Sequence, residues 1–292
     1  MATMYKTAIV TDTNSGLLPE EAEHLGIHLV PMPVIVDEES FFEYVSITQA
    51  DFFARLKGGA AVSTSQPSPG ALLSCWDALL EIYDNLVYIP MSSSLSGEYQ
   101  TAAMLAEDYD GRVHVADTHR ISVTQRQAAL DALHWVQQEK SAAEIKAYLE
   151  HDGRNSDIFI AVNTLELLKK SGRVTAAGAA LGSILSIKPV LRIQGGKLDA
   201  YRKVRGMRAA IQAMIEGLQA DLQQLDCPQA MLRAAYAGDC AAGIAWQAAL
   251  QEAFPECTVG LDPLPLSVCC HVGYGALGVG IAKDILTEGD AI

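Results

Sequence analysis

Strand-like and helix-like segments alternate through the first half of the chain, and this alternation constrains the fold more than any other feature. The expected strands cover residues 8–12, 27–36, 86–91 and 113–117, and the expected helices cover residues 19–25, 51–56, 69–83, 98–107 and 122–140. Such alternation is typical of a mostly parallel sheet with helices on both faces. We therefore predict an α/β N-terminal domain, with ligands outside the carboxyl ends of its strands.

The second half of the chain has a different pattern. Two alternating runs, residues 189–193 and 198–204, flank Gly195-Gly196 and predict an antiparallel hairpin. Around it we expect a strand at 158–162, a small-residue helix at 175–185, a helix from 207, a strand at 231–236, a helix from 241 and two final strands. This order predicts an α+β domain with a mixed or antiparallel sheet. We place the domains at residues 1–160 and 161–292, with the second closing over the ligand site.

Charge and hydropathy exclude several classes of partner. The net charge of −14 and the pI near 4.8 argue against binding to nucleic acid or to an anionic membrane. No apolar run reaches the roughly 18 residues of a membrane span, and we expect no stable membrane insertion. The start of the chain lacks a signal-type apolar block, so we expect a cytoplasmic protein. The cysteine spacings fit no zinc site, and we predict no metal.

Two hydroxyl-rich turns, residues 64–68 and 92–97, are the main candidates for a binding site. The second turn joins an expected strand to an expected helix, where free backbone N–H groups and rotatable hydroxyls can hold an anion. We expect Thr64 and Ser65 to supply one pair of donors to a carboxylate, and Ser92 and Ser93 another. A simpler interpretation, that Ser94 or Ser96 only caps the helix, applies to one of these two serines.

His271 is the candidate that would complete this site from the C-terminal domain. Its imidazole can donate to a carboxylate or to a serine hydroxyl, although a single histidine is more often a core residue with satisfied hydrogen bonds. Asp12 and Asp117 also lie at expected strand ends, where they can pair with hydroxyls or cap helices. The sequence identifies no partner that would make either of them an acid–base catalyst.

A series of short motifs over nearly the whole chain resembles the DegV family, which are fatty-acid-binding proteins of bacteria. The motifs are residues 9–13 (IVTDT), 30–34 (VPMPV), 64–68 (TSQPS), 92–100 (SSSLSGEYQ), 168–173 (LKKSGR), 203–206 (KVRG) and 271–273 (HVG). Each motif alone is weak, and their order along the chain makes the resemblance specific.

The resemblance implies a long-chain fatty acid buried between the two domains, with its carboxylate at Thr64, Ser65, Ser92, Ser93 and His271. It implies that the protein is a lipid-binding subunit with no catalytic residue and no cofactor. In this family a separate fatty acid kinase uses ATP and magnesium to convert the presented acid to an acyl phosphate. Arg173 could bind the carboxylate bidentately or face outward toward that partner or the phosphoryl group, and we expect the outward role. A solvated surface arginine is the remaining alternative.

The chain departs from the family pattern at three positions. Thr124 and Arg126 stand in a stretch where glycines are usual, and Tyr274 replaces a usual proline. Arg126 is either an additional anion contact or, as we expect, a solvated helix residue. The small-residue helix at 176–185 either lines the acyl tunnel or packs closely against a neighbour.

Two other functions remain open at this stage. A serine hydrolase of acyl esters would use Ser93 as nucleophile, His271 as base and Asp12 or Asp117 to orient it, although no G-x-S-x-G elbow is present. A phosphate-ligand module would also suit a serine-rich helix start. Residues 273–278 spell G-x-G-x-x-G, but too little chain follows for a dinucleotide domain, so we expect a tight turn and close strand packing there.

Overall fold

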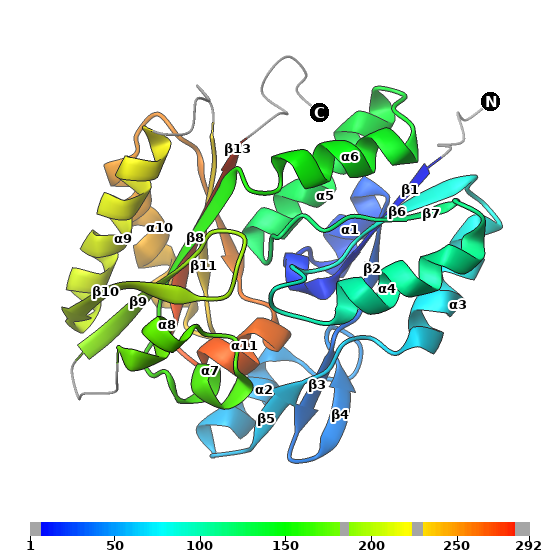
Figure 1. Cartoon of the computed structure of the whole chain (residues 1–292). Helices are drawn as coiled ribbons and strands as arrows, with labels where there is room; N and C mark the ends of the chain where they lie inside the picture. The colour runs from blue at the N-terminus through cyan, green and yellow to red at the C-terminus, as the bar shows by residue number, and fades with distance from the viewer. Residues whose placement is uncertain (1–6, 182–186, 224–229, 284–292) are drawn as a thin grey trace.

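The computed structural model describes residues 7–181, 187–223 and 230–283, and these residues form three sheets (Figure 1). A four-stranded sheet and a six-stranded sheet stand side by side. The third sheet lies below them in the view of Figure 1, together with α2, α7 and α11.

The four-stranded sheet is entirely parallel, as predicted. Its order is β2 (Ile27–Val30), β1 (Thr7–Asp12), β6 (Asn85–Ile89) and β7 (Val113–Val115). Alternate residues of β1 point to opposite faces. Ile9 packs with α5 (Val123–Gln137) and α6 (Ala142–Asp152), whereas Ala8 and Val10 pack with α3 (Pro69–Leu80) and α4 (Glu98–Ala106). Burial on both faces explains why these strands are continuously apolar. The first helix, α1, covers Pro19–Leu25.

The six-stranded sheet is mixed, which confirms the predicted α/β plus α+β fold. Its order is β10 (Asp199–Arg205), β9 (Ile187–Ile193), β8 (Ser156–Ala161), β13 (Leu277–Lys283), β11 (Ala230–Tyr236) and β12 (Val259–Pro263). The β9–β10 hairpin is antiparallel, as expected. Phe159 and Ala161 of β8 pack with α9 (Gly206–Leu222) and α10 (Cys240–Ala253) on one face. Ile158 and Ile160 point to the opposite face, toward the rest of the molecule.

The expected strand at residues 27–36 is wrong, because it is two strands in different sheets. After β2, the chain enters β3 (Pro33–Val36), which pairs antiparallel with β4 (Glu39–Phe42) and β5 (Val62–Thr64). Pro31 and Pro33 have no N–H to donate to a ladder, and the intervening Met32 N–H donates to Thr13 Oγ1 at 3.0 Å. The break therefore follows from missing donors. Helix α2 covers Gln49–Lys57.

The sequence prediction missed helix α6 and several short elements. The short ones are β4, β5, α7 (Glu166–Ser171), the 3₁₀ segments η1 (Thr13–Ser15) and η2 (Glu107–Tyr109), and α11 (Leu266–Val272) between the two final strands. The expected small-residue helix is α8 (Ala176–Ala180), and residues 182–186 of that prediction lie outside the described residues. Strand β8 is the first strand of the six-stranded sheet along the chain, and it starts at Ser156, close to the boundary expected at residue 160. The division into two domains stays a prediction.

Candidate functional site

An apolar cavity lies between the inner face of the six-stranded sheet and the N-terminal half of the chain. It has about 860 Å³ of empty space when the open space at its mouth is included. Its apolar wall includes Met32, Met91, Leu95, Ile121, Ile158, Ile160, Leu168, Ile193, Ala235, Leu264, Val268 and Val279. Its polar lining consists of Asn14, Thr64, Ser65, Gln66, Ser96, Ser122, Arg173, Ser267 and His271.

Thr64 and His271 meet at this cavity from distant parts of the chain. Thr64 ends β5 and His271 lies in the last turn of α11, and 3.0 Å separates Thr64 Oγ1 from His271 Nε2. Ser65 also lines the cavity, but its exposed hydroxyl donates to the carbonyl of Gln66 at 3.2 Å. Two of the five residues expected to hold a carboxylate are therefore in direct contact.

The imidazole of His271 has one ring nitrogen that is available to a ligand. Its Nδ1 is buried and has no hydrogen-bond partner among the described residues. Burial lowers the pKa of His271 to about 4, and the positive charge of Arg173 acts in the same direction. The ring is therefore neutral near pH 7, with one nitrogen at Thr64 and the other free for a ligand.

Ser92 and Ser93 do not line the cavity itself. Ser92 is buried, its N–H donates to the Arg120 carbonyl at 2.8 Å, and its hydroxyl accepts from Ser94 N–H at 3.2 Å. Ser93 is half-buried and lines a shallow outer hollow beside the cavity with Ser96 and Arg173. Ser96 Oγ accepts the N–H of Glu98, the first residue of α4, at 3.1 Å, but the N-cap residue of α4 is Gly97, so the expectation that Ser94 or Ser96 is the N-cap is wrong.

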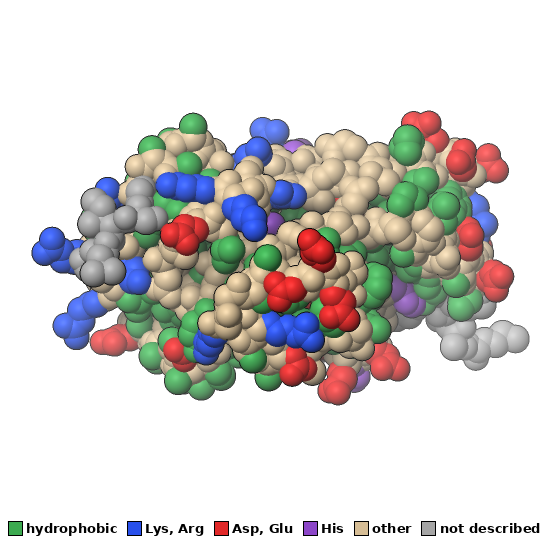
Figure 2. All heavy atoms as spheres, turned by 90° about the horizontal axis from the view of Figure 1, so that it is seen from below, with side chains coloured by type: hydrophobic (Ala, Val, Ile, Leu, Met, Phe, Trp, Pro, Cys, Tyr) green, Lys and Arg blue, Asp and Glu red, His purple; other side chains and the backbone are tan. Residues whose placement is uncertain are grey.

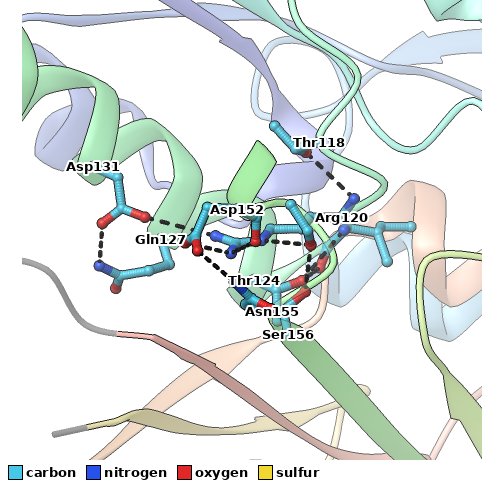
Figure 3. A network of polar contacts seen from close by, with 10 residues as sticks. Thr118, Arg120, Thr124, Gln127, Asp131, Asp152, Asn155 and Ser156 are labelled. Carbon is cyan, nitrogen blue, oxygen red and sulfur yellow. Dashed lines mark hydrogen bonds and ion pairs between the residues drawn. The ribbon is translucent and has the colours of Figure 1, made fainter. Parts of the chain in front are cut away.

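A buried ion-pair network holds the loop that supports this serine turn (Figure 3). The Arg120 guanidinium lies 3.6 Å from Asp131 of α5 and 3.5 Å from Asp152 at the end of α6, and donates to the carbonyl of Gly153 at 3.2 Å. The Arg120 carbonyl receives the Ser92 N–H, and Asp117 Oδ1 in the same loop receives the Ser93 N–H at 3.3 Å. The network thereby fixes the backbone of both serines.

The two hydroxyl-rich turns also contact each other. Gln66 Nε2 donates to Thr101 Oγ1 of α4 at 2.9 Å, and a Cβ at Gly97 would approach Gln66 Oε1 to 3.3 Å. A side chain at position 97 would press on Gln66, so glycine lets the first turn pack closely on the second.

Arg173 lies where the cavity and two outer hollows meet. It lines the cavity, the hollow that contains Ser93 and Lys197, and a third hollow that contains Lys170. Its Nε donates to the Leu95 carbonyl at 3.3 Å, and its Nη1 donates to the Ser171 carbonyl. No carboxylate in the described part of the chain is within ion-pair distance of it, which leaves its charge available to an anion.

Glu43 is a buried residue outside the cavity lining that supports this site, and the sequence analysis missed it. Its Oε2 accepts from Thr13 Oγ1 at 2.9 Å and its Oε1 accepts from the N–H of Leu266, the first residue of α11. Ser267 Oγ also donates to Asn14 Oδ1 at 2.5 Å. These bonds tie the start of α11, and with it His271, to the N-terminal half. Nothing in the local pattern around Glu43 indicates this contact, because its partners are far away in the chain.

The geometry disfavours a serine hydrolase. His271 contacts Thr64 rather than Ser93, and Asp12 and Asp117 are occupied elsewhere. Asp12 accepts the N–H groups of Asn14 and Met91, each at 2.7 Å, and Asp117 accepts from Ser93 N–H. Within the described residues, no chain of nucleophile, base and orienting carboxylate connects these groups.

All three positions that depart from the family pattern make structural contacts. Arg126 is buried and ion-paired with Glu21 of α1, so the expectation of a solvated residue is wrong. Tyr274 lies edge-on to Phe53 and under Lys57, whose Nζ is 3.6 Å from the ring centre. Thr124 Oγ1 donates to the Ile121 carbonyl at 2.9 Å.

The glycine-rich segment and α8 are structural. Gly273 and Gly275 take positive φ in the turn between α11 and β13, and Gly278 lies within β13, as expected for a turn followed by strand packing. The described part of the small-residue helix, Ala176–Ala180, does not line the cavity; Gly178 packs against the Leu198 carbonyl at close range.

Neither a metal cluster nor a membrane span is found among the described residues. No group of three His, Cys, Asp or Glu residues there is arranged to hold a metal ion. None of the helices described is long and apolar enough to cross a bilayer.

The fold and the site define an α/β protein with an apolar cavity whose polar lining includes hydroxyl groups and a neutral histidine. The sequence profile of the DegV family matches residues 6–284, and the chain belongs to this family. A DegV domain-containing protein of Deinococcus radiodurans is 31% identical over 94% of this chain and 97% of its own length. One from Listeria monocytogenes is 32% identical over 94% of this chain and 97% of its own length.

Solved structures of the family share the fold. A fatty-acid-binding DegV family protein from Thermus thermophilus superposes with a TM-score of 0.87 at 28% identity, over 95% of this chain and 99% of that protein. DegV of Bacillus subtilis, described as a fatty acid binding protein, superposes with a TM-score of 0.84 at 25% identity, over 96% of this chain and all of that protein.

Proposed function

We propose that the protein binds a long-chain fatty acid in the cavity, with the acyl chain along the apolar wall and the carboxylate near Thr64 and His271. The observation that carries the proposal is the contact of these two polar residues in an otherwise apolar lining. A buried carboxylate needs hydrogen-bond donors, and this pair can supply one of them. When the Thr64 hydroxyl donates to His271 Nε2, the N–H at Nδ1 is free to donate to the ligand; when the proton is on Nε2 and is donated to Thr64, the Thr64 hydroxyl donates instead. Ser65 also lines the cavity and belongs to the proposed set of carboxylate-binding residues, whereas Ser92 and Ser93 lie outside the cavity lining and are not proposed as direct contacts.

The tail of the ligand supplies most of the affinity. At about 0.8 kcal/mol per buried CH₂ group, a chain of roughly 14 to 18 carbons makes about 10 kcal/mol available before the costs of association. The head group then orients the ligand. Fatty-acid binding by the relatives from Thermus thermophilus and Bacillus subtilis supports the same ligand class here.

We further propose that the bound acid is presented to a separate, ATP-dependent fatty acid kinase, which makes an acyl phosphate. Arg173, exposed Lys170 and exposed Lys197 surround the outer hollows and would attract a phosphoryl group or an acidic partner surface. Figure 2 shows Lys and Arg side chains gathered on the side of the six-stranded sheet, although the chain as a whole is acidic. We place this lipid-binding subunit in the bacterial cytoplasm, where ATP is available.

A fatty-acid titration tests the binding part of the proposal. Oleate or palmitate is expected to bind with one site per chain, and Thr64→Val is expected to weaken binding about fivefold, since it removes one net hydrogen bond. Thr48→Val is the matched control, because Thr48 caps α2 outside the cavity. If neither oleate nor palmitate binds, the proposal is refuted.

An ester-hydrolysis assay tests the alternative. A chromogenic acyl ester is expected to give no turnover that depends on Ser93. Hydrolysis that disappears in Ser93→Ala but not in Ser68→Ala would favour the hydrolase instead.

A hydroxamate assay tests presentation to a kinase. The loaded protein is mixed with ATP, magnesium and an extract of the source bacterium, and hydroxylamine traps any acyl phosphate as a hydroxamate. Hydroxamate is expected only when the loaded protein is present. Arg173→Ala is expected to give less of it than the control variant Arg202→Ala, because Arg202 already pairs with Glu216. Equal yields with and without the protein would contradict presentation.

A further inference from the structure

A second polar cluster interrupts the apolar wall of the cavity. It consists of Asn14, Ser122 and Ser267, which are 1%, 6% and 3% exposed. Ser267 Oγ donates to Asn14 Oδ1 at 2.5 Å, and Ser122 N–H donates to the Asn14 carbonyl at 2.9 Å. Three elements therefore bring these side chains together: η1, the start of α5 and α11.

The cluster has hydrogen-bonding capacity that the protein does not use. Asn14 is largely satisfied, since its side chain bonds the Asp12 carboxylate and its Nδ2 is 3.2 Å from the sulfur of Met91, a weak acceptor. The Ser122 hydroxyl does not cap α5 and has no hydrogen-bond partner among the described residues. The Ser267 oxygen keeps its acceptor lone pairs, so the cluster offers both donors and acceptors to a ligand.

Ser122 also adopts a backbone conformation that favours glycine. Its φ of 55° and ψ of −134° lie outside the regions that residues with a Cβ normally occupy. Strain of this kind persists where the surrounding structure enforces it and is concentrated at ligand sites. A serine here keeps a hydroxyl in the cavity wall at the expense of stability.

The cluster lies one helical turn from the proposed carboxylate position. Ser267 and His271 both line the cavity and are four residues apart in α11, a spacing that places their Cβ atoms about 5–6 Å apart on one helix face. A chain whose carboxylate meets His271 would therefore pass the cluster within its first few carbons.

We propose that the cavity selects fatty acids that carry a hydroxyl group near the carboxyl end, and that Asn14, Ser122 and Ser267 bind this hydroxyl. The inference rests on the proposed function and adds the substrate class. A hydroxyl both donates and accepts, which matches the unused capacity of the cluster. An unsubstituted chain would leave these polar groups facing CH₂ groups, which costs affinity.

Binding of four acids by isothermal titration tests the inference. The acids are hexadecanoic acid and its 3-hydroxy, 5-hydroxy and 16-hydroxy derivatives. At least one of the 3- and 5-hydroxy acids is expected to bind about fivefold or more tightly than hexadecanoic acid, because it gains a hydrogen bond in a buried site. The 16-hydroxy acid is expected to bind more weakly than both the 3-hydroxy and the 5-hydroxy acid.

Two variants and a control locate the effect. Ser122→Gly and Ser267→Ala are each expected to abolish the preference, and Ser122→Gly is also expected to raise the melting temperature by relieving strain. Asp110→Gly is the matched control, since Asp110 has a positive φ of 50° but is exposed and outside the cavity. It is expected to keep the preference.

The outcomes separate this inference from the proposed function. If hexadecanoic acid binds as tightly as the 3- and 5-hydroxy acids, or if the preference survives in both variants, the inference is wrong and fatty-acid binding stands. If none of the four acids binds, both are wrong.

Discussion

Thr64 Oγ1 and His271 Nε2 lie 3.0 Å apart, although 207 positions separate the two residues in the chain. The contact joins the end of β5 to the last turn of α11, so it exists only when the two halves of the chain are closed on each other. The polar lining at this point of the cavity therefore depends on the packing of distant elements.

Thr64 and His271 are expected to act together on a bound carboxylate. Thr64→Val and His271→Gln should each weaken fatty-acid binding about fivefold, and the double variant should weaken it by less than the product of the two. Residues in direct contact show such coupling in a double-mutant cycle, measured here by titration. Fully additive losses would mean that the two side chains contact the ligand independently.

Lowering the pH should destabilise the protein through His271. Its pKa is lowered to about 4, chiefly by burial, from an ordinary value of 6.5. Between these values the unfolded chain binds a proton that the folded chain does not, so the free energy of unfolding falls as pH falls through this window. In urea titrations, the difference in the free energy of unfolding between the wild type and His271→Gln should therefore decrease from pH 7 to pH 4. A difference that is constant with pH would contradict the buried, neutral imidazole.

Glu43 should produce a pH dependence of the opposite sign. Burial raises its pKa to about 7 from an ordinary value of 4.5. Between these values the folded chain keeps a proton that the unfolded chain loses, so this contribution to stability is lost as pH rises from about 4.5 to 7. The stability of wild type relative to Glu43→Gln should fall over that range. The exposed Glu81→Gln variant serves as control, and an equal slope in both comparisons would exclude Glu43 as the source.

Arg120 should be among the residues least tolerant of substitution. Arg120→Met leaves the buried Asp131 and the half-buried Asp152 without this guanidinium, and removing one partner of a buried ion pair costs about 3–5 kcal/mol. Arg202→Met breaks an exposed pair with Glu216 and should cost about 1 kcal/mol or less. Chemical denaturation measures both, and similar losses would show that the network in Figure 3 contributes little.

The sequence predicted the elements whose pattern is local. The apolar runs of β1, β6 and β7 and the paired runs around Gly195 were recognised because their periodicity and turn residues lie within a few positions. The prediction of a single strand over residues 27–36 was wrong at Pro31 and Pro33. Prolines have no N–H group to donate to a strand ladder, and this was the sequence feature that could have indicated the break. Helix α11 is seven residues long and mostly apolar, and such a run is too short to distinguish a helix from a strand by periodicity.

The site was predicted only in part, because much of it depends on tertiary contacts. The resemblance to the DegV family and the hydroxyl-rich turns pointed to Thr64 and His271. Glu43, Asn14 and Ser267 carry no local motif, and they matter only through partners that fold close to them. The strained backbone of Ser122 likewise has no signal in the sequence.

Native mass spectrometry of the freshly purified protein, followed by denaturation and lipid identification, tests the central claim most directly. The account predicts close to one fatty acid per chain, released on denaturation and identified by mass. A protein that is purified empty, and that gains no mass when palmitate or oleate is added, would contradict it.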